Sequence, residues 1–325
     1  MKTYVMAAIA AFLLSALFCR LLLPVLKKLK AGQNILCYVK EHEKKAGTPT
    51  MGGLAFLFAA FISACMFGDG ADRRFVAALA MGLAFAAVGF LDDFIKIKRK
   101  NNLGLKACQK LVFQCAAAVL AGIYCYRAGL TALRIPFTQK QVQSGMFIVP
   151  LAAFVFLALV NAVNLTDGLD GLAGGTGAAY FVSFGLIIAV QQSKGVSAGV
   201  GRADALALIC FCVAAALMGF LLFNTPPACV FMGDTGSLSL GGFAASAAVF
   251  SGNALYVPVV GIMFVVSVIT VIAQVIYYKA TKGGRIFLMA PVHHHFQQKG
   301  YSECKISFAY AAITSLAGLF ALAFL

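Results

Sequence analysis

Long apolar runs recur along the whole chain and are separated by short polar or glycine-rich joints. A helix needs about 20 apolar residues to cross the hydrocarbon core of a bilayer. No stretch is left over for a soluble domain, so the pattern predicts an all-α, polytopic membrane protein with a single domain over residues 1–325. Ten spanning helices are predicted, at about residues 3–26, 51–68, 75–95, 107–128, 146–164, 174–192, 204–223, 237–252, 256–279 and 306–325.

Composition supports this reading. Of the 325 residues, 62% are hydrophobic and 11% are charged, whereas soluble domains have about 45–50% and about 25%. The net charge of +15 raises the question of a nucleic-acid partner, but its placement argues against one. The odd-numbered joints between helices carry 17 Lys and Arg residues, and the even-numbered joints with the amino terminus carry 8. The positive-inside rule then puts the odd joints in the cytoplasm and both termini outside.

The polar stretches follow the same division, since all of them fall at odd joints. They are "KKAGTPTMGG" (44–53), "DDFIK" (92–96), "NAVNLTDGLDGLAGG" (161–175), "FNTPPACVFMGDTG" (223–236) and "PVHHHFQQKG" (291–300). Eight of the 11 acidic residues also lie on this side, which the positive-inside rule does not require. Carboxylates at a membrane boundary are costly unless they are hydrated, paired or bound to a cation. The pattern therefore predicts a functional site facing the cytoplasm.

Asp92 and Asp93 are adjacent and lie about 100° apart on a helix. One is expected to face a cleft, while the other makes a structural contact or pairs with Lys96. Close carboxylates raise the pKa of one partner, which suits a proton acceptor. The alternative is a helix end with two solvated acids.

Two further acidic stretches offer oxygen ligands. Asp167 and Asp170 are spaced i,i+3 and share one face if their loop is helical, and Asn164 precedes them. The alternative is a capping segment beside flexible glycines. Asp234, in "MGDTGS", is open to a cation; its alternative role is the N-cap of the eighth helix.

Three histidines and a lysine complete the set of candidate site residues. His293, His294 and His295 point in different directions, so at least one suits a phosphate donor or proton carrier, with zinc binding and a solvated loop as alternatives. Thr50 can cap the second helix. Lys45 stands beside a glycine-rich helix start, a combination that favours phosphate.

Hard oxygen ligands of this kind select magnesium or manganese. Lysines next to such an ion are typical of phosphoryl transfer. No Walker loop of the GxxxxGKS type is present, so ATP hydrolysis is not predicted.

The motifs GTPTMGG, DD, NLTDGLDGLAGG, FNTPPACVFMGDTGS and PVHHHF, in this order, resemble the phospho-N-acetylmuramoyl-pentapeptide transferases, which belong to the polyprenyl-phosphate sugar-1-phosphate transferases. The resemblance covers nearly the whole chain. It implies transfer of phospho-MurNAc-pentapeptide from UDP-MurNAc-pentapeptide to undecaprenyl phosphate in the bacterial cytoplasmic membrane, giving lipid I and UMP for peptidoglycan synthesis. It also implies ten helices, a homodimer and Mg²⁺.

The resemblance also implies residue roles. Asp234 corresponds to the magnesium ligand, Asp93 to the acid that deprotonates the lipid phosphate, and Asp92 to its essential neighbour. Asp170 and Phe231 would face the uracil, and Lys96 and Lys110 the phosphates. The remaining positions are catalytic His293 and the substrate-binding residues Lys45, Asn164, Asp167, Asn224 and His294. The chain departs from the family pattern at Pro226, where an aromatic residue is common, and at Gln297, where Glu is frequent.

Two rival functions remain at the sequence level. One is a sister transferase that passes GlcNAc-1-phosphate from UDP-GlcNAc to the same lipid; GTPTMGG and HHHF favour the muramoyl branch. The other is an ion-coupled transporter, which would need carboxylates along a path through the membrane. The predicted acids gather on one side instead. The sequence leaves open whether the lipid phosphate attacks directly or through an Asp-phosphate intermediate.

Overall fold

The computed structural model describes residues 1–29, 47–99, 104–138, 140–195 and 204–325. Each of the ten predicted segments is helical in it, which confirms the all-α class. The helices are α1 (Lys2–Lys28), α2 (Gly53–Phe67), α3 (Arg73–Arg99), α4 (Ala107–Arg127), α5 (Ile148–Thr166), α6 (Leu172–Ser193), α7 (Asp204–Asn224), α8 (Gly233–Phe250), α9 (Val257–Val260), α10 (Ile262–Ala280), α11 (Val292–Gln298) and α12 (Glu303–Ala323).

Within the described residues, eight helices are long and apolar enough to cross a membrane. These are α1, α3, α4, α5 with the preceding η2 turn (Gly145–Phe147), α6, α7, α10 and α12. The α2 helix has 15 residues, and α8, with 18 residues, is not among these spans. The count of ten crossings and the outer location of the termini therefore stay predictions.

The prediction of one continuous helix over 256–279 is wrong. A 3₁₀ turn, η3 (Ala254–Tyr256), and the four-residue α9 precede α10, and Gly261 separates α9 from α10. Pro258 fits the first turn of α9 because that position needs no N–H donor. Glycine is a poor helix former, so the helix restarts after Gly261.

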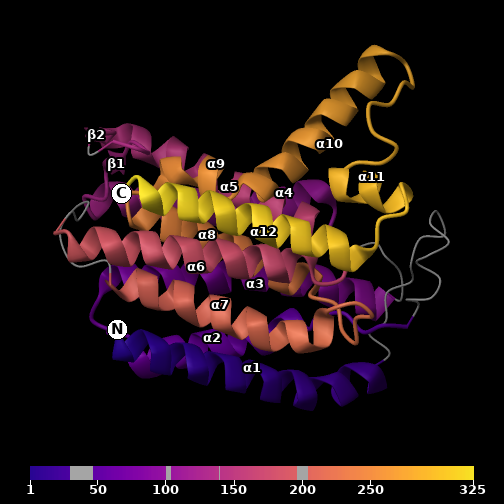
Figure 1. Cartoon of the computed structure of the whole chain (residues 1–325), viewed down its shortest axis with the longest axis horizontal. Coiled ribbons are helices and arrows are strands. Elements are labelled where there is room, and N and C mark those ends of the chain that lie inside the picture. Colours follow the sequence, from indigo (N-terminus) through magenta and orange to yellow (C-terminus); the bar gives the residue numbers. More distant parts are fainter. Residues whose placement is uncertain (30–46, 100–103, 139, 196–203) are drawn as a thin grey trace.

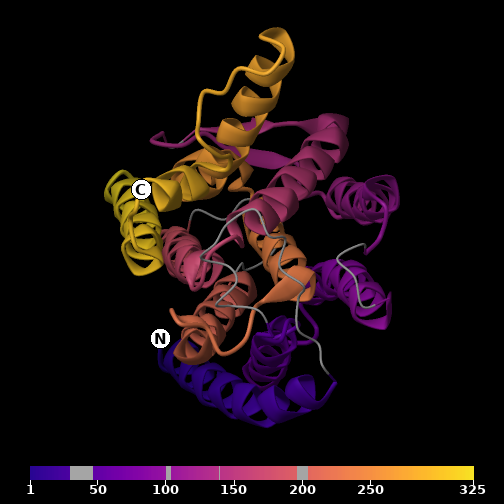
Figure 2. The ribbon, with the colours of Figure 1, turned by 90° about the vertical axis from the view of Figure 1, so that its right-hand side faces the viewer.

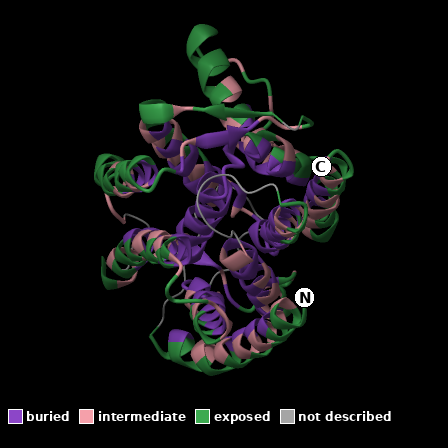
Figure 3. Ribbon diagram, turned by 90° about the vertical axis from the view of Figure 1, so that its left-hand side faces the viewer, coloured by how far each residue is buried: buried purple, intermediate pink, exposed green. Residues whose placement is uncertain are grey.

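The α8 helix lies at the centre of the bundle, surrounded by the other long helices (Figures 2 and 3). Of its residues, all except Asp234 are buried. It contacts protein instead of lipid, which explains why small and hydroxyl-bearing residues suffice there. Glycines let its backbone approach its neighbours closely: a Cβ on Gly241 would lie 2.4 Å from the Cα of Val160 in α5.

The two chain ends lie at one end of the bundle and α11 lies at the other (Figure 1). A short hairpin lies at the same end as the termini, with β1 (Ala132–Arg134) antiparallel to β2 (Gln141–Gln143). At the other end, α10 slants out of the bundle and the chain folds back towards α11 (Figure 1). The Gln274 side chain holds this return by accepting hydrogen bonds from the N–H groups of Ile286 and Phe287. The main apolar core extends from Ala7 to Ala321, and a smaller cluster contains Leu172 and Tyr310; the single domain stays a prediction.

Candidate active site

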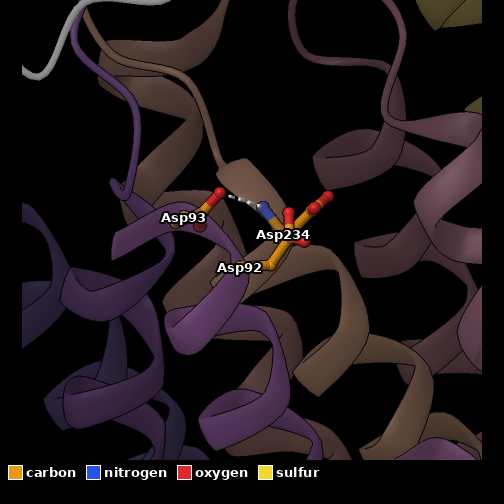
Figure 4. Close-up of side chains that lie close together, drawn as sticks. All are labelled: Asp92, Asp93 and Asp234. Atoms are coloured by element: carbon orange, nitrogen blue, oxygen red, sulfur yellow. Dashed lines mark hydrogen bonds between the residues drawn. The ribbon is translucent and has the colours of Figure 1, made fainter. Parts of the chain in front are cut away.

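Three carboxylates from distant parts of the sequence lie close together (Figure 4). Asp92 and Asp93 lie near the end of α3, and Asp234 lies in the first turn of α8. One oxygen from each lies within 4.8 Å of the others. The Asp92 and Asp93 side chains are buried, so these are not solvated acids at a helix end.

Asp93 binds the start of α8. Its carboxylate accepts hydrogen bonds from the N–H of Asp234 (3.2 Å), the N–H of Thr235 (2.8 Å) and the hydroxyl of Thr235 (2.6 Å). These N–H groups have no partner within the helix, and the helix dipole favours an anion there. The cap of α8 therefore comes from α3, and Asp234 is not the N-cap of its own helix.

Gly89 allows this close approach of α3 and α8. A Cβ at position 89 would lie 2.2 Å from the carbonyl oxygen of Asp234 and 2.7 Å from the Cα of Thr235. Both atoms belong to backbone, which cannot rotate away. A glycine one turn before the acidic pair is thus a condition for the Asp93 contact.

Asp92 and Asp234 share a lysine. The Lys96 ammonium lies 2.6 Å from Asp92 and 2.8 Å from Oδ2 of Asp234. The sequence-based expectation that one acid of the pair binds Lys96 is confirmed. Asp92 also accepts a hydrogen bond from the Leu105 N–H (2.8 Å), which ties the residues just before α4 to α3.

Two more helices contribute to the surroundings of Asp234. Lys110, on α4, places its ammonium 3.1 Å from Oδ2. Asn164, on α5, donates to Oδ1 at 2.7 Å and to the Ser237 hydroxyl at 2.9 Å. Side chains from three neighbouring helices therefore orient the Asp234 carboxylate, and two of these side chains are cations. Three hard oxygen donors fit a divalent cation such as Mg²⁺, and two ammonium groups fit phosphate oxygens.

Asp167 and Asp170 do not share a helix face, because α5 ends at Thr166 and residues 167–171 form turns. Asp170 is buried, and its carboxylate accepts a hydrogen bond from the Ala228 N–H (3.0 Å). Burial raises the pKa of the partly exposed Asp167 carboxyl to about 8, and the negative charges of Asp234, Asp93 and Asp170 act in the same direction.

Asn224 is buried, and its side-chain amide is hydrogen-bonded to backbone groups. Its oxygen accepts from the Gly171 N–H (3.1 Å), and its nitrogen donates to the Val230 carbonyl (2.9 Å). It joins the loop after Asp170 to the loop before α8. This placement supports the shape of the site, while any substrate contact by Asn224 stays a prediction.

The GTPTMGG segment pairs with the loop before α8. The Phe231 N–H donates to the Pro49 carbonyl, and the Gly52 N–H donates to the Phe231 carbonyl. The Phe231 side chain remains partly exposed. The predicted cap by Thr50 is wrong: α2 begins after Gly52, and the buried Thr50 hydroxyl has no hydrogen-bond partner among the described residues. Lys45 lies outside the described residues.

The three histidines of α11 have different surroundings, although the Nε2 atoms of His293 and His294 both lie near Gly168. His293 is fully buried, and neither ring nitrogen has a hydrogen-bond partner in the described part of the chain. Burial lowers the pKa of its imidazole to about 3, with His294 acting in the same direction. His294 is partly exposed, and His295 accepts a hydrogen bond from the Leu288 N–H (3.1 Å).

Sequence reasoning assigned no site role to Thr235, Ser237 or Glu303, and it noted Gln297 only as a departure from the family pattern. The Thr235 and Ser237 hydroxyls follow Asp234 closely in "GDTGS". Their closeness in sequence to this acidic residue was a signal that they belong to the site. Their partners, Asp93 and Asn164, come from other helices, so only packing shows what they bind.

Two family models match parts of the chain. Residues 75–252 match the model of glycosyl transferase family 4, and residues 45–57 match signature 1 of phospho-N-acetylmuramoyl-pentapeptide-transferase. A phospho-N-acetylmuramoyl-pentapeptide-transferase of Listeria welshimeri is 42% identical over 302 residues, which is 91% of this chain and 90% of that protein. The enzyme of the same name from Clostridium perfringens is 43% identical over 312 residues, covering 95% and 93%. The chain therefore belongs to glycosyl transferase family 4 and, within it, to the phospho-N-acetylmuramoyl-pentapeptide transferases.

Proposed function

We propose that this protein transfers phospho-MurNAc-pentapeptide from UDP-MurNAc-pentapeptide to undecaprenyl phosphate and releases UMP, forming lipid I. The observation that carries the proposal is the setting of Asp234. Two ammonium groups lie within 3.1 Å of its Oδ2, and two further carboxylates lie beside it. Cations and hard oxygen donors at one point are what a diphosphate substrate and its metal ion require.

Asp234 and Asp92 would hold the ion, which we propose to be Mg²⁺. When bound, it would neutralise charge on the diphosphate and on the leaving UMP. Lys96 and Lys110 are placed to bind phosphate oxygens as negative charge moves during transfer. Asn164 keeps Asp234 in the orientation that the cation needs, because it donates to Oδ1 and leaves Oδ2 directed at the lysines.

The proposed base role of Asp93 is less well supported than a role in holding α8. All its described hydrogen bonds come from the first turn of α8. A phosphate monoester has a second pKa near 6, so the lipid phosphate is already largely ionised at neutral pH. It needs little help from a base to attack in line.

The loops around Asp234 would form the nucleotide side of the site. Asp170 and the partly exposed Phe231 are proposed to face the uracil, and Asp167, His293 and His294 to line the sugar and phosphate path. His293 is buried and His294 is partly exposed, which supports His294 over His293 for a direct contact with substrate. Lys45 is proposed to bind phosphate from the segment before α2.

We propose a location in the bacterial cytoplasmic membrane with the site facing the cytoplasm. The basic residues at the odd-numbered joints support this orientation. The position of both termini at the end opposite α11 also supports it (Figure 1). A homodimer remains a proposal that rests on the family alone; cross-linking in membranes tests it.

The test is UMP release by purified protein in detergent. We expect release from UDP-MurNAc-pentapeptide only when both a polyprenyl phosphate and Mg²⁺ are present. Asp234→Asn should lower turnover by at least about 10²-fold, whereas Asp204→Asn, at the other end of the bundle, should leave turnover near the wild-type value. Release without the lipid phosphate, or faster turnover of UDP-GlcNAc, would contradict the proposal.

A further inference from the structure

Two pairs of polar side chains join α4 to α5 next to the site. In the first pair, the Lys110 ammonium lies 3.5 Å from Oδ1 of Asn164. In the second pair, Nδ2 of Asn161 donates to Oε1 of Gln114 at 3.0 Å. The two residues on α4 are spaced i,i+4 and the two on α5 are spaced i,i+3, so each helix presents both of its residues on one face. The Gln114–Asn161 pair therefore lies one helical turn beyond the pair that contacts Asp234.

The neighbouring groups fix which way the two amides point. The Leu157 carbonyl can only accept a hydrogen bond, so the Asn161 side chain must turn its NH₂ group towards it, at 2.8 Å. The second hydrogen of this NH₂ group then goes to Oε1 of Gln114. The Gln114 side chain is 1% exposed, and its Nε2 has no hydrogen-bond partner among the residues that the structure describes. A buried N–H group without a partner lowers stability, so stability by itself does not account for an amide at this position.

Gln114 also anchors the half of α4 that carries Lys110. It is the one buried residue over positions 107–117, and most of its neighbours there are exposed. Further along α4, Gly122 packs directly on the α5 backbone, since a Cβ there would lie 2.5 Å from the Val149 carbonyl oxygen. Backbone packing therefore fixes α4 at Gly122, and the amide bond to Asn161 fixes it closer to the site.

We propose that Gln114 and Asn161 are positioning residues that hold α4 against α5 and thereby place the Lys110 ammonium on Asp234 and on the phosphate of the substrate. The proposal rests on the proposed function, in which Lys110 binds phosphate oxygens. The Lys110 ammonium lies 3.1 Å from Oδ2 of Asp234, which is already longer than the usual charge-assisted hydrogen bond. Without the amide bond, the site end of α4 can move outwards about Gly122, and a displacement of about 1 Å at a reacting group costs about 10²-fold in turnover.

The first experiment reports on Lys110 without using turnover. Purified protein in detergent receives a short pulse of acetic anhydride, and the acetylation of each lysine is measured by mass spectrometry. A lysine held by a carboxylate reacts slowly because acetylation needs the free lone pair of the amine. We expect Gln114→Leu to raise the acetylation rate of Lys110 at least about threefold relative to the exposed Lys279. An unchanged rate at Lys110 would overturn the proposal, whether or not the protein releases UMP.

The second experiment compares two buried Gln–Asn pairs in the UMP-release assay. Gln191→Leu is the matched control, because Gln191 is buried near the end of α6 and exchanges two hydrogen bonds with Asn253, of 3.0 and 2.9 Å. We expect Gln114→Leu to lower kcat about tenfold and to keep the unfolding temperature within about 3 °C of wild type, because it also removes the unpaired donor. The control should lose stability and keep its turnover per folded molecule. Equal turnover per folded molecule in the two variants would contradict the proposal.

Two combined variants test whether Gln114 acts through its bond and through Lys110, and they do not depend on Gln114→Leu being folded. Exchange of the two amides, Gln114→Asn with Asn161→Gln, keeps the combined length of the pair and should restore most of the kcat that Gln114→Asn alone loses. Gln114→Asn combined with Lys110→Met should be no slower than Lys110→Met alone, because the two residues act as one unit. An exchange that restores no activity, or a slower double variant, would contradict the proposal.

Discussion

Substitution of Gly89 by alanine tests whether the packing of α3 against α8 places Asp234. The added Cβ would lie 2.2 Å from the Asp234 carbonyl oxygen, whereas ordinary contact begins at 3.4 Å. The start of α8 must therefore move by about 1.2 Å, the difference between these distances. The hydrogen bonds that the N–H groups of Asp234 and Thr235 donate to the Asp93 carboxylate, now 3.2 and 2.8 Å long, would lengthen or break.

Two quantities should change together. Overpacking of this kind costs about 1–3 kcal/mol of stability. A displacement of about 1 Å at a reacting group costs about 10²-fold in turnover. UMP release is measured as a function of Mg²⁺ concentration, and thermal unfolding is followed in the same detergent. We expect Gly89→Ala to need more Mg²⁺ for half-maximal activity and to turn over about 10²-fold more slowly.

Gly82→Ala is the control on the same pair of helices. Its Cβ would meet the ring of Phe243, with the nearest atom at 2.2 Å, and this contact lies two turns further from the acidic pair. We expect a loss of stability with turnover per folded molecule within about threefold of wild type. Wild-type turnover and Mg²⁺ dependence in a folded Gly89→Ala protein would refute the link between this contact and the position of Asp234.

Three further results are expected. Thr235→Val should raise the Mg²⁺ requirement and lower turnover about tenfold, because Asp93 loses a hydrogen bond. The control is Ser239→Ala, which removes a hydrogen bond from α8 to the Gly82 carbonyl and should leave both quantities near wild type. Equal effects of the two substitutions would contradict the reasoning. Lys110→Met should raise the KM for the nucleotide with a fall in kcat, measured by UMP release; an unchanged kcat would exclude a role in transfer. The unfolded His293 side chain binds a proton below about pH 6.5, but the folded one only near pH 3, so its contribution to stability is full above pH 6.5 and falls as the pH drops towards 3. The unfolding temperature of His293→Gln should fall less than that of the wild type as the pH drops over this range. Equal dependence of the unfolding temperature on pH in the two proteins would refute this role of His293.

Much of the site could be predicted from the sequence because its chemistry is carried by conspicuous polar residues in apolar surroundings. Asp92, Asp93 and Asp234 stood out for this reason, and the structure brings them together. Thr50 was misread because the sequence offers a hydroxyl near a helix start, but the chain begins α2 two residues later, where glycines contact the loop before α8. Asp167 and Asp170 were placed on one face only on the condition of a helix, and the turns after Thr166 remove that condition.

The sequence by itself determined the all-α membrane architecture, the family and the end of the bundle at which the chemistry gathers. These follow from residue type and spacing, because the bilayer requires about 20 apolar residues per span and penalises unpaired charge. The tertiary structure alone decided which partner each polar group binds. Asp93 caps a helix that lies 140 positions further along the chain, and Asn161 on α5 donates to Gln114 on α4. Such pairings depend on how helices pack at close range, and no local pattern in the sequence specifies them.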